Sequence, residues 1–424
     1  MRRSGHHGIV TQEFWEESQA MNFDNTIDLQ QEIKKSISLT DGTRKLTIKG
    51  QTKSYPVYQI PLDLLLYNRQ NGRIISSMNR YESEGNDIQT LSKEEYNDLV
   101  EQFIVDSNSS ALNKTKQNIA LFGQRLPGVV LNDGTVVDGN RRFTCLRQLK
   151  REGKTSFFDA VILDPSEGLS AVDIKRLELN LQHGEERPVD YNAIDNLVEV
   201  YNDIEKNKYF TVKEYATNTN KTETDVKKML KKANLMVDFL VFINAEGKYY
   251  VARDLDLDGP LQEVMLILNK EKDEEEYERV KSALFTAMTL SKEGDLTRHI
   301  RRIGKEIIQA GNREQFLEEY EDIVEDVYDA YQGEANVTVN TVKKINETLK
   351  DVREEAGAIV SNRVDETVLT RVKMKPIDSL NTVIRTLDNV DADQIARMDG
   401  VSKKEFARLV EQIRKELEAY ESRL

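Results

Sequence analysis

Residues 129–153, VVLNDGTVVDGNRRFTCLRQLKREG, restrict the fold of this chain more than any other stretch. Two short β-branched runs flank Asn-Asp-Gly at 132–134, a turn sequence typical of antiparallel hairpins. Apolar residues then recur at helical spacing from Phe143 to Leu149, and Gly153 stands where such a helix would end. The stretch therefore predicts a β-hairpin that leads directly into an amphipathic helix.

Neighbouring segments extend this pattern from about residue 55 to 165. A strand pattern runs into Pro61, a capping box of Ser92 and Glu95 opens an expected helix, and residues 157–163 form another expected strand. Beyond residue 170 the apolar spacing becomes almost wholly helical. We therefore predict an α+β fold, in which a small mixed α/β domain precedes a mainly α-helical C-terminal half.

These patterns divide the 424 residues into four expected parts. Residues 1–50 form an N-terminal extension, and residues 51–165 form the mixed α/β domain. Residues 166–255 form a helical domain, and residues 256–424 form an acidic helical region suited to dimerisation or partner binding.

Composition excludes several classes of protein. The chain has one cysteine, so no intramolecular disulfide can form, and its four histidines lack metal-site spacing. No apolar run is long enough to span a membrane and no secretory signal opens the chain, so we expect a cytoplasmic protein. The net charge of −14 means that any contact with nucleic acid needs a local basic surface.

Arg141 and Arg142 stand where the helix after the hairpin should begin. A helix N-terminus is partly positive, so each arginine there costs roughly 0.3–1 kcal/mol unless a negative group compensates. Gly139 permits a tight turn, and Asp138 or Asn140 is suited to cap the helix. The turn is either a phosphate site gripped by the arginines, or an ordinary helix start whose arginines point to solvent or pair with carboxylates.

This turn is one of three elements that together resemble the ParB/sulfiredoxin superfamily. The string Val-Tyr-Gln-Ile-Pro-Leu-Asp at 57–63, with Asn71-Gly72-Arg73 after it, is similar to the strand, IPL and Asn-x-Arg elements of that family. Gly139-Asn140-Arg141-Arg142 is similar to its Gly-x-x-Arg turn. Leu-Asn-Leu-Gln at 179–182 and Arg-Pro-Val-Asp-Tyr at 187–191 stand where the family has Glu-Asn-x-Gln and a helix start. The resemblance covers residues 55 to 235.

The resemblance implies a fold that binds a nucleoside triphosphate, CTP or ATP, together with Mg²⁺. In the family the Gly-x-x-Arg turn holds the phosphates, the earlier loop adds charge, and the asparagine of the third element faces the phosphates or the metal ion. Carried over, the expected nucleotide-binding residues are Arg73, Asp138, Gly139, Asn140, Arg141, Arg142, Asn180 and Gln182, with Asn180 also reaching Mg²⁺ through phosphate.

The chain departs from the family at two positions. Leu179 occupies the place of the family glutamate that helps to hold the metal, with Glu178 beside it. Asn140 occupies the place of the sulfiredoxin catalytic cysteine. We therefore do not expect sulfinic acid reduction, and we expect Cys145 to be a small core residue on the apolar side of its helix.

Residues 211–236 have the pattern of a helix-turn-helix, and ParB-like proteins place such a motif just after the nucleotide domain. Asn220 stands at the turn position that usually holds glycine. The alternative is a plain helical hairpin with a solvated lysine face. The residues expected to contact DNA are Thr222, Thr224, Lys227, Lys228 and Lys231.

The final segment, 401–424, has an apolar stripe at helical spacing. The resemblance implies that this segment forms a homodimer, and packing within the chain explains the pattern equally well.

We therefore expect a nucleoid-associated, ParB-like protein of a bacterium, phage or mobile element, in which bound nucleotide controls DNA binding or clamping. One alternative is a metal-dependent nuclease, NTPase or phosphotransferase, with Asp138, Glu178 or Glu185 as base or metal ligand. The other is a nucleotide-free scaffold whose acidic helices contact proteins.

Overall fold

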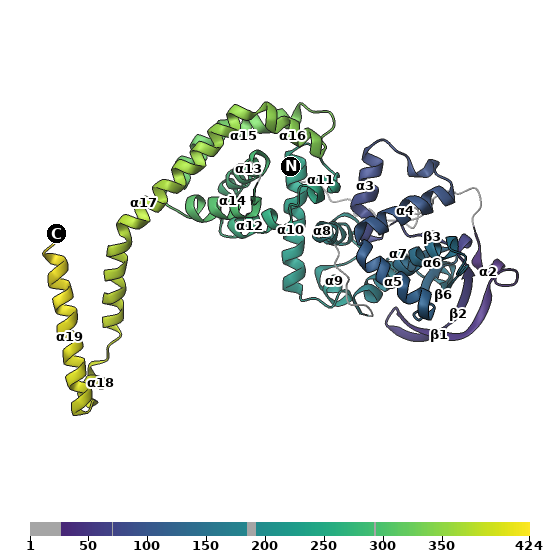
Figure 1. The fold of residues 1–424 in the computed structure, drawn as a ribbon, viewed down its shortest axis with the longest axis horizontal. Helices are drawn as coiled ribbons and strands as arrows, with labels where there is room; N and C mark the ends of the chain where they lie inside the picture. The colour runs from purple at the N-terminus through teal and green to yellow at the C-terminus, as the bar shows by residue number, and fades with distance from the viewer. Residues whose placement is uncertain (1–26, 70, 185–191, 292–293) are drawn as a thin grey trace, which may run out of the picture.

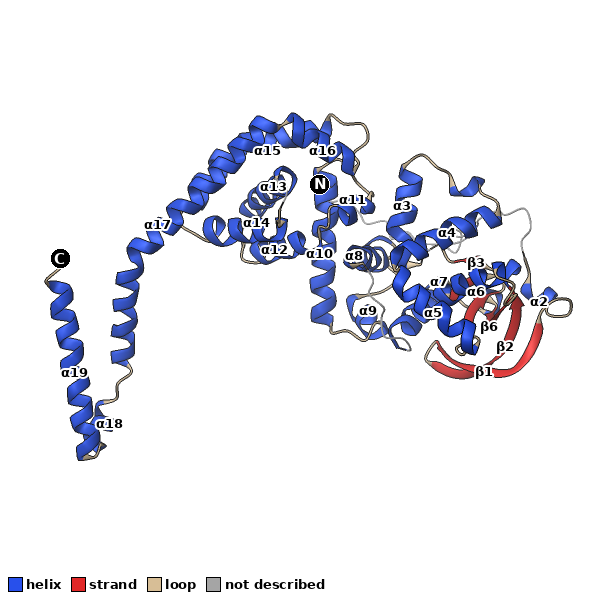
Figure 2. Ribbon diagram, viewed as in Figure 1, coloured by secondary structure: helices blue, strands red, loops and turns tan. Residues whose placement is uncertain are grey.

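The computed structural model describes residues 27–69, 71–184, 192–291 and 294–424, so most of the expected N-terminal extension lies outside the described residues. It confirms the α+β class, with one sheet in the N-terminal part and helices through the remainder (Figures 1 and 2). The strands are β1 (Ser38–Ile48), β2 (Gln51–Pro61), β3 (Leu66–Tyr67), β4 (Gly128–Leu131), β5 (Thr135–Asp138) and β6 (Phe157–Leu163).

The six strands form one mixed sheet in the order β1-β2-β6-β4-β5-β3. Strands β4 and β5 pair antiparallel, with Val129 opposite Asp138, which is the hairpin that the Asn-Asp-Gly turn predicts. Gly134 in that turn has a φ of 88°, and a Cβ there would lie 2.3 Å from the Leu64 carbonyl oxygen. The parallel pairs are β3 with β5 and β4 with β6.

Helices cover both faces of the sheet. Consecutive strand residues point to opposite faces, so neighbouring apolar residues pack against different helices. Val130 packs with one set of helices, and its neighbour Val129 packs against α7 (Ala171–Gly184) through Leu177 and Leu181. The helices on the Val130 side are α2 (Leu29–Glu32), α3 (Ile75–Ser83), α4 (Lys93–Ser107), α5 (Ser109–Phe122) and α6 (Asn140–Arg151). Strand β1 lies within the stretch expected to be an extension, so the sheet unit begins before residue 51.

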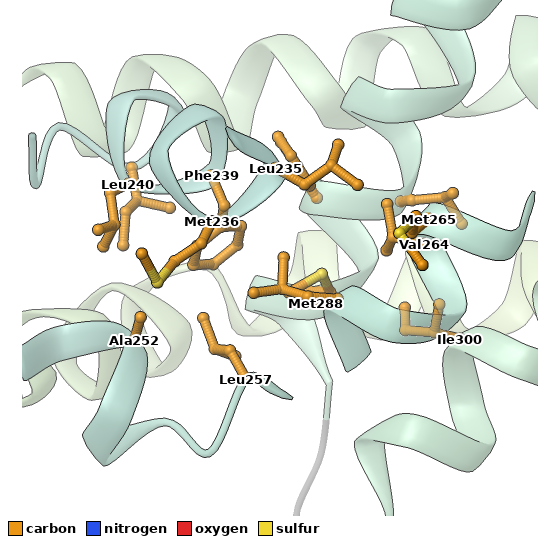
Figure 3. Close-up of a cluster of buried hydrophobic side chains, with 14 of the residues drawn as sticks. Leu235, Met236, Phe239, Leu240, Ala252, Leu257, Val264, Met265, Met288 and Ile300 are labelled. Atoms are coloured by element: carbon orange, nitrogen blue, oxygen red, sulfur yellow. The ribbon is translucent and has the colours of Figure 1, made fainter. Parts of the chain in front are cut away.

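The second unit is helical and has one continuous core. Buried side chains from Leu179 to Val364 form a single cluster, and Figure 3 shows Phe239 and Met288 within it. No separate core begins at residue 256 among the described residues, so the expected division at 255/256 does not separate two cores. Its helices are α8 (Ala193–Tyr201), α9 (Val212–Asn218), α10 (Glu223–Phe242), α11 (Tyr249–Asp254), α12 (Asp258–Leu268), α13 (Glu274–Leu290), α14 (Leu296–Ile303), α15 (Arg313–Gln332) and α16 (Val339–Thr348), with π-helical turns η5 (Asn202–Lys206) and η6 (Gly304–Ile308).

A helical arm projects from this unit. It consists of the distal part of α17 (Lys350–Asp388), then α18 (Ala392–Arg397) and α19 (Gly400–Glu421), and Figure 1 shows it far from the sheet. Neither α18 nor α19 contains a buried residue. None of the helices in the part of the chain that the structure describes combines the length and apolar character needed to cross a membrane.

Candidate nucleotide and DNA sites

A cavity of about 80 Å³ opens at the N-terminus of α6, where segments far apart in the sequence meet. The turn from Val137 to Arg142 forms one wall, and Gln182 from the last turn of α7 forms another. Asn71, just before the short helix η2 (Gly72–Ile74), completes it with Ile104 and Thr115. Parts of all three elements of the family resemblance therefore face one small space.

Gly139 begins α6 in a left-handed conformation, with a φ of 101°. Gly139 itself is the N-cap residue and has no side chain, so the N-cap position falls on neither Asp138 nor Asn140, contrary to expectation. The first backbone bond runs from Phe143 N to Gly139 O at 2.8 Å, and the N–H groups of the preceding turn have no acceptor within the helix. This end of α6 therefore suits a bound anion.

The carboxylate of Asp138 forms ion pairs with two arginines. Its Oδ2 accepts hydrogen bonds from Arg44 Nη1 at 2.8 Å and from Arg142 Nη2 at 3.0 Å. Arg44 and Arg142 are 6% and 8% exposed, so this is a buried network. Arg142 thus follows the carboxylate-pairing alternative, and two guanidinium groups share one carboxylate beside the cavity.

Among the described residues, two amide oxygens of residues that line the cavity have no hydrogen-bond partner. They are Asn140 Oδ1 and Gln182 Oε1, and both atoms are buried. Gln182 Nε2 donates to Glu178 Oε1 at 3.2 Å, which orients its oxygen away from that carboxylate. Because buried polar atoms normally have partners, these two oxygens are placed to meet a ligand or an ion.

The remaining expected residues lie in different places. Asn180 lies two residues from Gln182, about 200° around α7, and does not line the cavity. Arg73 lies in η2, two residues after Asn71 in the chain. Leu179, at the family's glutamate position, is fully buried in the helical core. Glu185 and residues 187–191 lie outside the described residues.

Glu178 belongs to a buried ionic cluster that sequence reasoning missed. Lys175 Nζ lies 3.0 Å from Glu199, 3.4 Å from Glu178 and 3.9 Å from Asp203. Burial raises the pKa of Glu178 to about 7. Burial likewise raises the pKa of Asp203. Burial alone would lower the pKa of Lys175, but the surrounding carboxylates hold it well above its usual value.

The expected helix-turn-helix corresponds to α9 and α10. Asn220 adopts a φ of 52° in the turn, and Thr222 caps α10 by accepting from Asp225 N. Thr224, Lys227 and Lys228 are exposed on the first turns of α10, and Lys231 Nζ donates to Asn269 at 2.5 Å. A surface with two exposed lysines is thus available to an anionic partner.

Helix α7 connects the cavity with this helix pair. Its end supplies Gln182 to the cavity, while Arg176 lies 3.9 Å from Glu214 of α9 and 5.6 Å above the ring of Phe210. Helix α7 therefore contacts both the cavity and α9, the first helix of the pair.

No protein-family model matches this chain, and no curated protein sequence matches it. In the described ranges, no group of three or more histidine, cysteine, aspartate or glutamate residues is arranged to hold a metal ion.

Proposed function

We propose that this protein is a ParB-like, nucleotide-controlled DNA-binding protein, in which a nucleoside triphosphate binds at the start of α6. The observation that carries this proposal is the cavity, because Asn71, the turn at 138–142 and Gln182 converge there from three distant segments. A helix N-terminus that begins at a glycine, with Arg141 lining the cavity beside it, offers the N–H and guanidinium donors that bind a phosphate.

The size of the cavity favours a phosphate group in it, with the nucleoside outside. About 80 Å³ holds a few water-sized groups and is far below the volume that encloses a drug-sized ligand. The unpartnered oxygens of Asn140 and Gln182 are of the hard type that Mg²⁺ accepts. They would hold the ion, which when bound would neutralise phosphate charge.

The contacts of the acidic residues favour binding over catalysis. Asp138 already accepts from two arginines, which leaves it poorly suited to take a proton from a nucleophile. Glu178 accepts hydrogen bonds from Gln182 and from Lys175, and does not itself line the cavity. Asp138 and Glu178 therefore have structural roles in this proposal.

DNA would bind at the start of α10, through Lys227 and Lys228. Contacts from these residues to phosphate supply non-specific affinity, and the cytoplasmic, nucleoid-associated location follows from that partner. Because α7 lines the cavity and contacts α9, a shift of Gln182 on nucleotide binding would reach α9 through Arg176, and α9 packs against α10.

A second copy of the chain would cover the arm. Sixteen of the 23 exposed large apolar side chains of the described residues lie between Val368 and Leu424. Ile377, Leu380, Ile384 and Leu387 repeat with coiled-coil spacing on α17, and the apolar residues from Phe406 to Tyr420 do so on α19. A two-helix arm of this kind pairs naturally with its own copy as a four-helix bundle.

Calorimetric titration with ATP, CTP, GTP and UTP, with and without Mg²⁺, tests the nucleotide site. We expect one nucleotide to bind, and Arg141→Ala to lose at least about tenfold in affinity, the loss of a charge-assisted contact. Arg302→Ala, which removes the same charge from an exposed position on α14, should bind like the wild type. No binding of any nucleotide by the folded wild type would support the nucleotide-free scaffold instead.

A further inference from the structure

A larger cavity, of about 270 Å³, lies between the sheet unit and the helical unit. Asn79 of α3 lines it from the sheet unit, and Asn202 and Asp203 of the π-helical turn η5 line it from the helical unit. Lys175 and Glu199 of the ionic cluster also line it. Figure 1 shows α3 next to α8 and α11 at this junction.

Three buried oxygen atoms around this cavity have no hydrogen-bond partner. In the described part of the chain they are Asn79 Oδ1, Asn202 Oδ1 and Asp203 Oδ2, the last of which faces Lys175 Nζ only at the longer ion-pair distance of 3.9 Å, and Asp203 as a whole is 3% exposed. The orientation of Asn79 is determined by its Nδ2, which donates to Gly247 O at 2.8 Å. Buried acceptors rarely remain unsatisfied, and here all three belong to residues that line one cavity, so this cavity suits a ligand with several hydrogen-bond donors.

The backbone of η5 brings two of these acceptors together. Asn207 N donates to Asn202 O at 2.8 Å, the long-range bond of a π-turn. This wider turn lets the adjacent residues Asn202 and Asp203 both line the cavity. Single π-turns inside helical segments occur frequently at functional sites.

The charges at the inner end of the cavity favour a cation. Lys175 is one positive group among the carboxylates of Glu178, Glu199 and Asp203. At the rim, Arg69 pairs with Glu82, so these two charges largely cancel, and Lys206 is exposed to solvent. Burial of the excess carboxylates raises the pKa of Asp203, which a cationic partner would relieve.

We propose that this cavity binds a small organic amine, with its ammonium donors on Asp203 Oδ2 and on the amide oxygens of Asn79 and Asn202. An amine fits better than a chelated metal, because the described residues hold no set of three acidic, histidine or cysteine ligands in metal-binding arrangement. The volume suits a ligand smaller than most drug-sized molecules. The bound amine would join α3 to η5 and so tie the two units together.

Calorimetric titration of the full chain with 1,4-diaminobutane and with spermidine, at constant ionic strength, tests this site. We expect saturable binding at one site per chain. Asp203→Asn, which keeps the shape and removes the charge, should lose at least about tenfold in affinity. Asn79→Ala, on the opposite wall, should also weaken binding.

Glu205→Gln is the matched control, because Glu205 lies on the same π-turn with an exposed side chain outside the cavity. It should bind the amine like the wild type. Absence of saturable amine binding by the folded wild type would overturn the proposal and leave ordered water as the occupant, and binding of Mg²⁺ alone would overturn the ligand class. Equal affinity in Asp203→Asn would also overturn it. None of these titrations contains nucleotide, so the result is independent of the phosphate site.

Discussion

Arg142 donates a hydrogen bond to Asp138 across one turn at the start of α6, at 3.0 Å, and the same carboxylate oxygen accepts from Arg44 of β1. Of the two adjacent arginines that the sequence singled out, Arg142 is therefore engaged in a buried structural network. Arg141 is the one we assign to phosphate. The two arginines should consequently differ in what their removal does, Arg142 affecting stability and Arg141 affecting ligand binding.

Asp138→Asn should destabilise the protein by about 3 kcal/mol, because it leaves two buried guanidinium groups without their carboxylate. Urea denaturation followed by circular dichroism measures this. Asp41→Asn, an exposed change on β1, should alter the free energy of unfolding by less than about 0.5 kcal/mol. A stable Asp138 variant that had lost a metal-dependent DNA-cleaving activity of the wild type would instead favour the nuclease alternative.

Glu178 should make stability depend on pH between about 4.5 and 7, its usual value and its value in the folded chain. A carboxyl whose pKa is raised by folding binds its proton more tightly in the folded chain, so its charge opposes folding as the pH rises through this window. The groups that act on it are Lys175, Glu199 and Asp203, together with Asp138.

Glu178→Gln removes this charge and keeps the size and planar shape of the side chain. The free energy of unfolding of the variant, relative to wild type, should therefore rise between pH 5 and pH 8 by on the order of 2 kcal/mol. Denaturant titrations at several pH values measure the difference. A difference that stays constant with pH would contradict the assigned pKa shift.

Lys227→Ala combined with Lys228→Ala should weaken DNA binding and lower its salt dependence. Each lost phosphate contact reduces the slope of log affinity against log salt by roughly 1. Fluorescence anisotropy across a salt series gives both quantities. Lys403→Ala with Lys404→Ala makes the same charge change on the arm, and should leave the slope as in the wild type.

If the arm forms the proposed dimer, Leu380→Asp with Leu387→Asp should convert it into a monomer, because charged groups would enter the apolar face of the arm. Sedimentation equilibrium should give twice the chain mass of 48.7 kDa for wild type and the single mass for the variant. Ser379→Asp, an exposed change on the same helix, should remain dimeric. A monomeric wild type at tens of micromolar would exclude the dimer.

Cys145 should resist iodoacetamide in the native protein. Burial raises the pKa of its thiol to about 12, and Sγ donates to Leu112 O at 3.6 Å. Alkylation measured by mass spectrometry should be slow in buffer and fast in concentrated urea, and the chain has only this cysteine to modify. Rapid native alkylation would show that α6 opens locally.

The local elements were predictable because their determinants are close together in the sequence. The Asn-Asp-Gly turn specified the β4–β5 hairpin, Ser92 and Glu95 specified the start of α4, and the Asn220 turn separates two helices as expected. Turn chemistry, capping and apolar periodicity act over a few residues, so one sequence suffices to read them. They also indicated the turn before α6 as the place for an anion.

Tertiary structure alone decided which charged groups meet. Nothing in the spacing of the sequence indicates that Arg44 will join Asp138, 94 residues away, or that Asp203 will lie near Lys175. The same holds for the shared core across residues 255 and 256, because apolar helices carry no mark of their partners. Packing selects such contacts by shape and burial, and these place Gln182 at the cavity while Asn180, on the same helix, lies away from it.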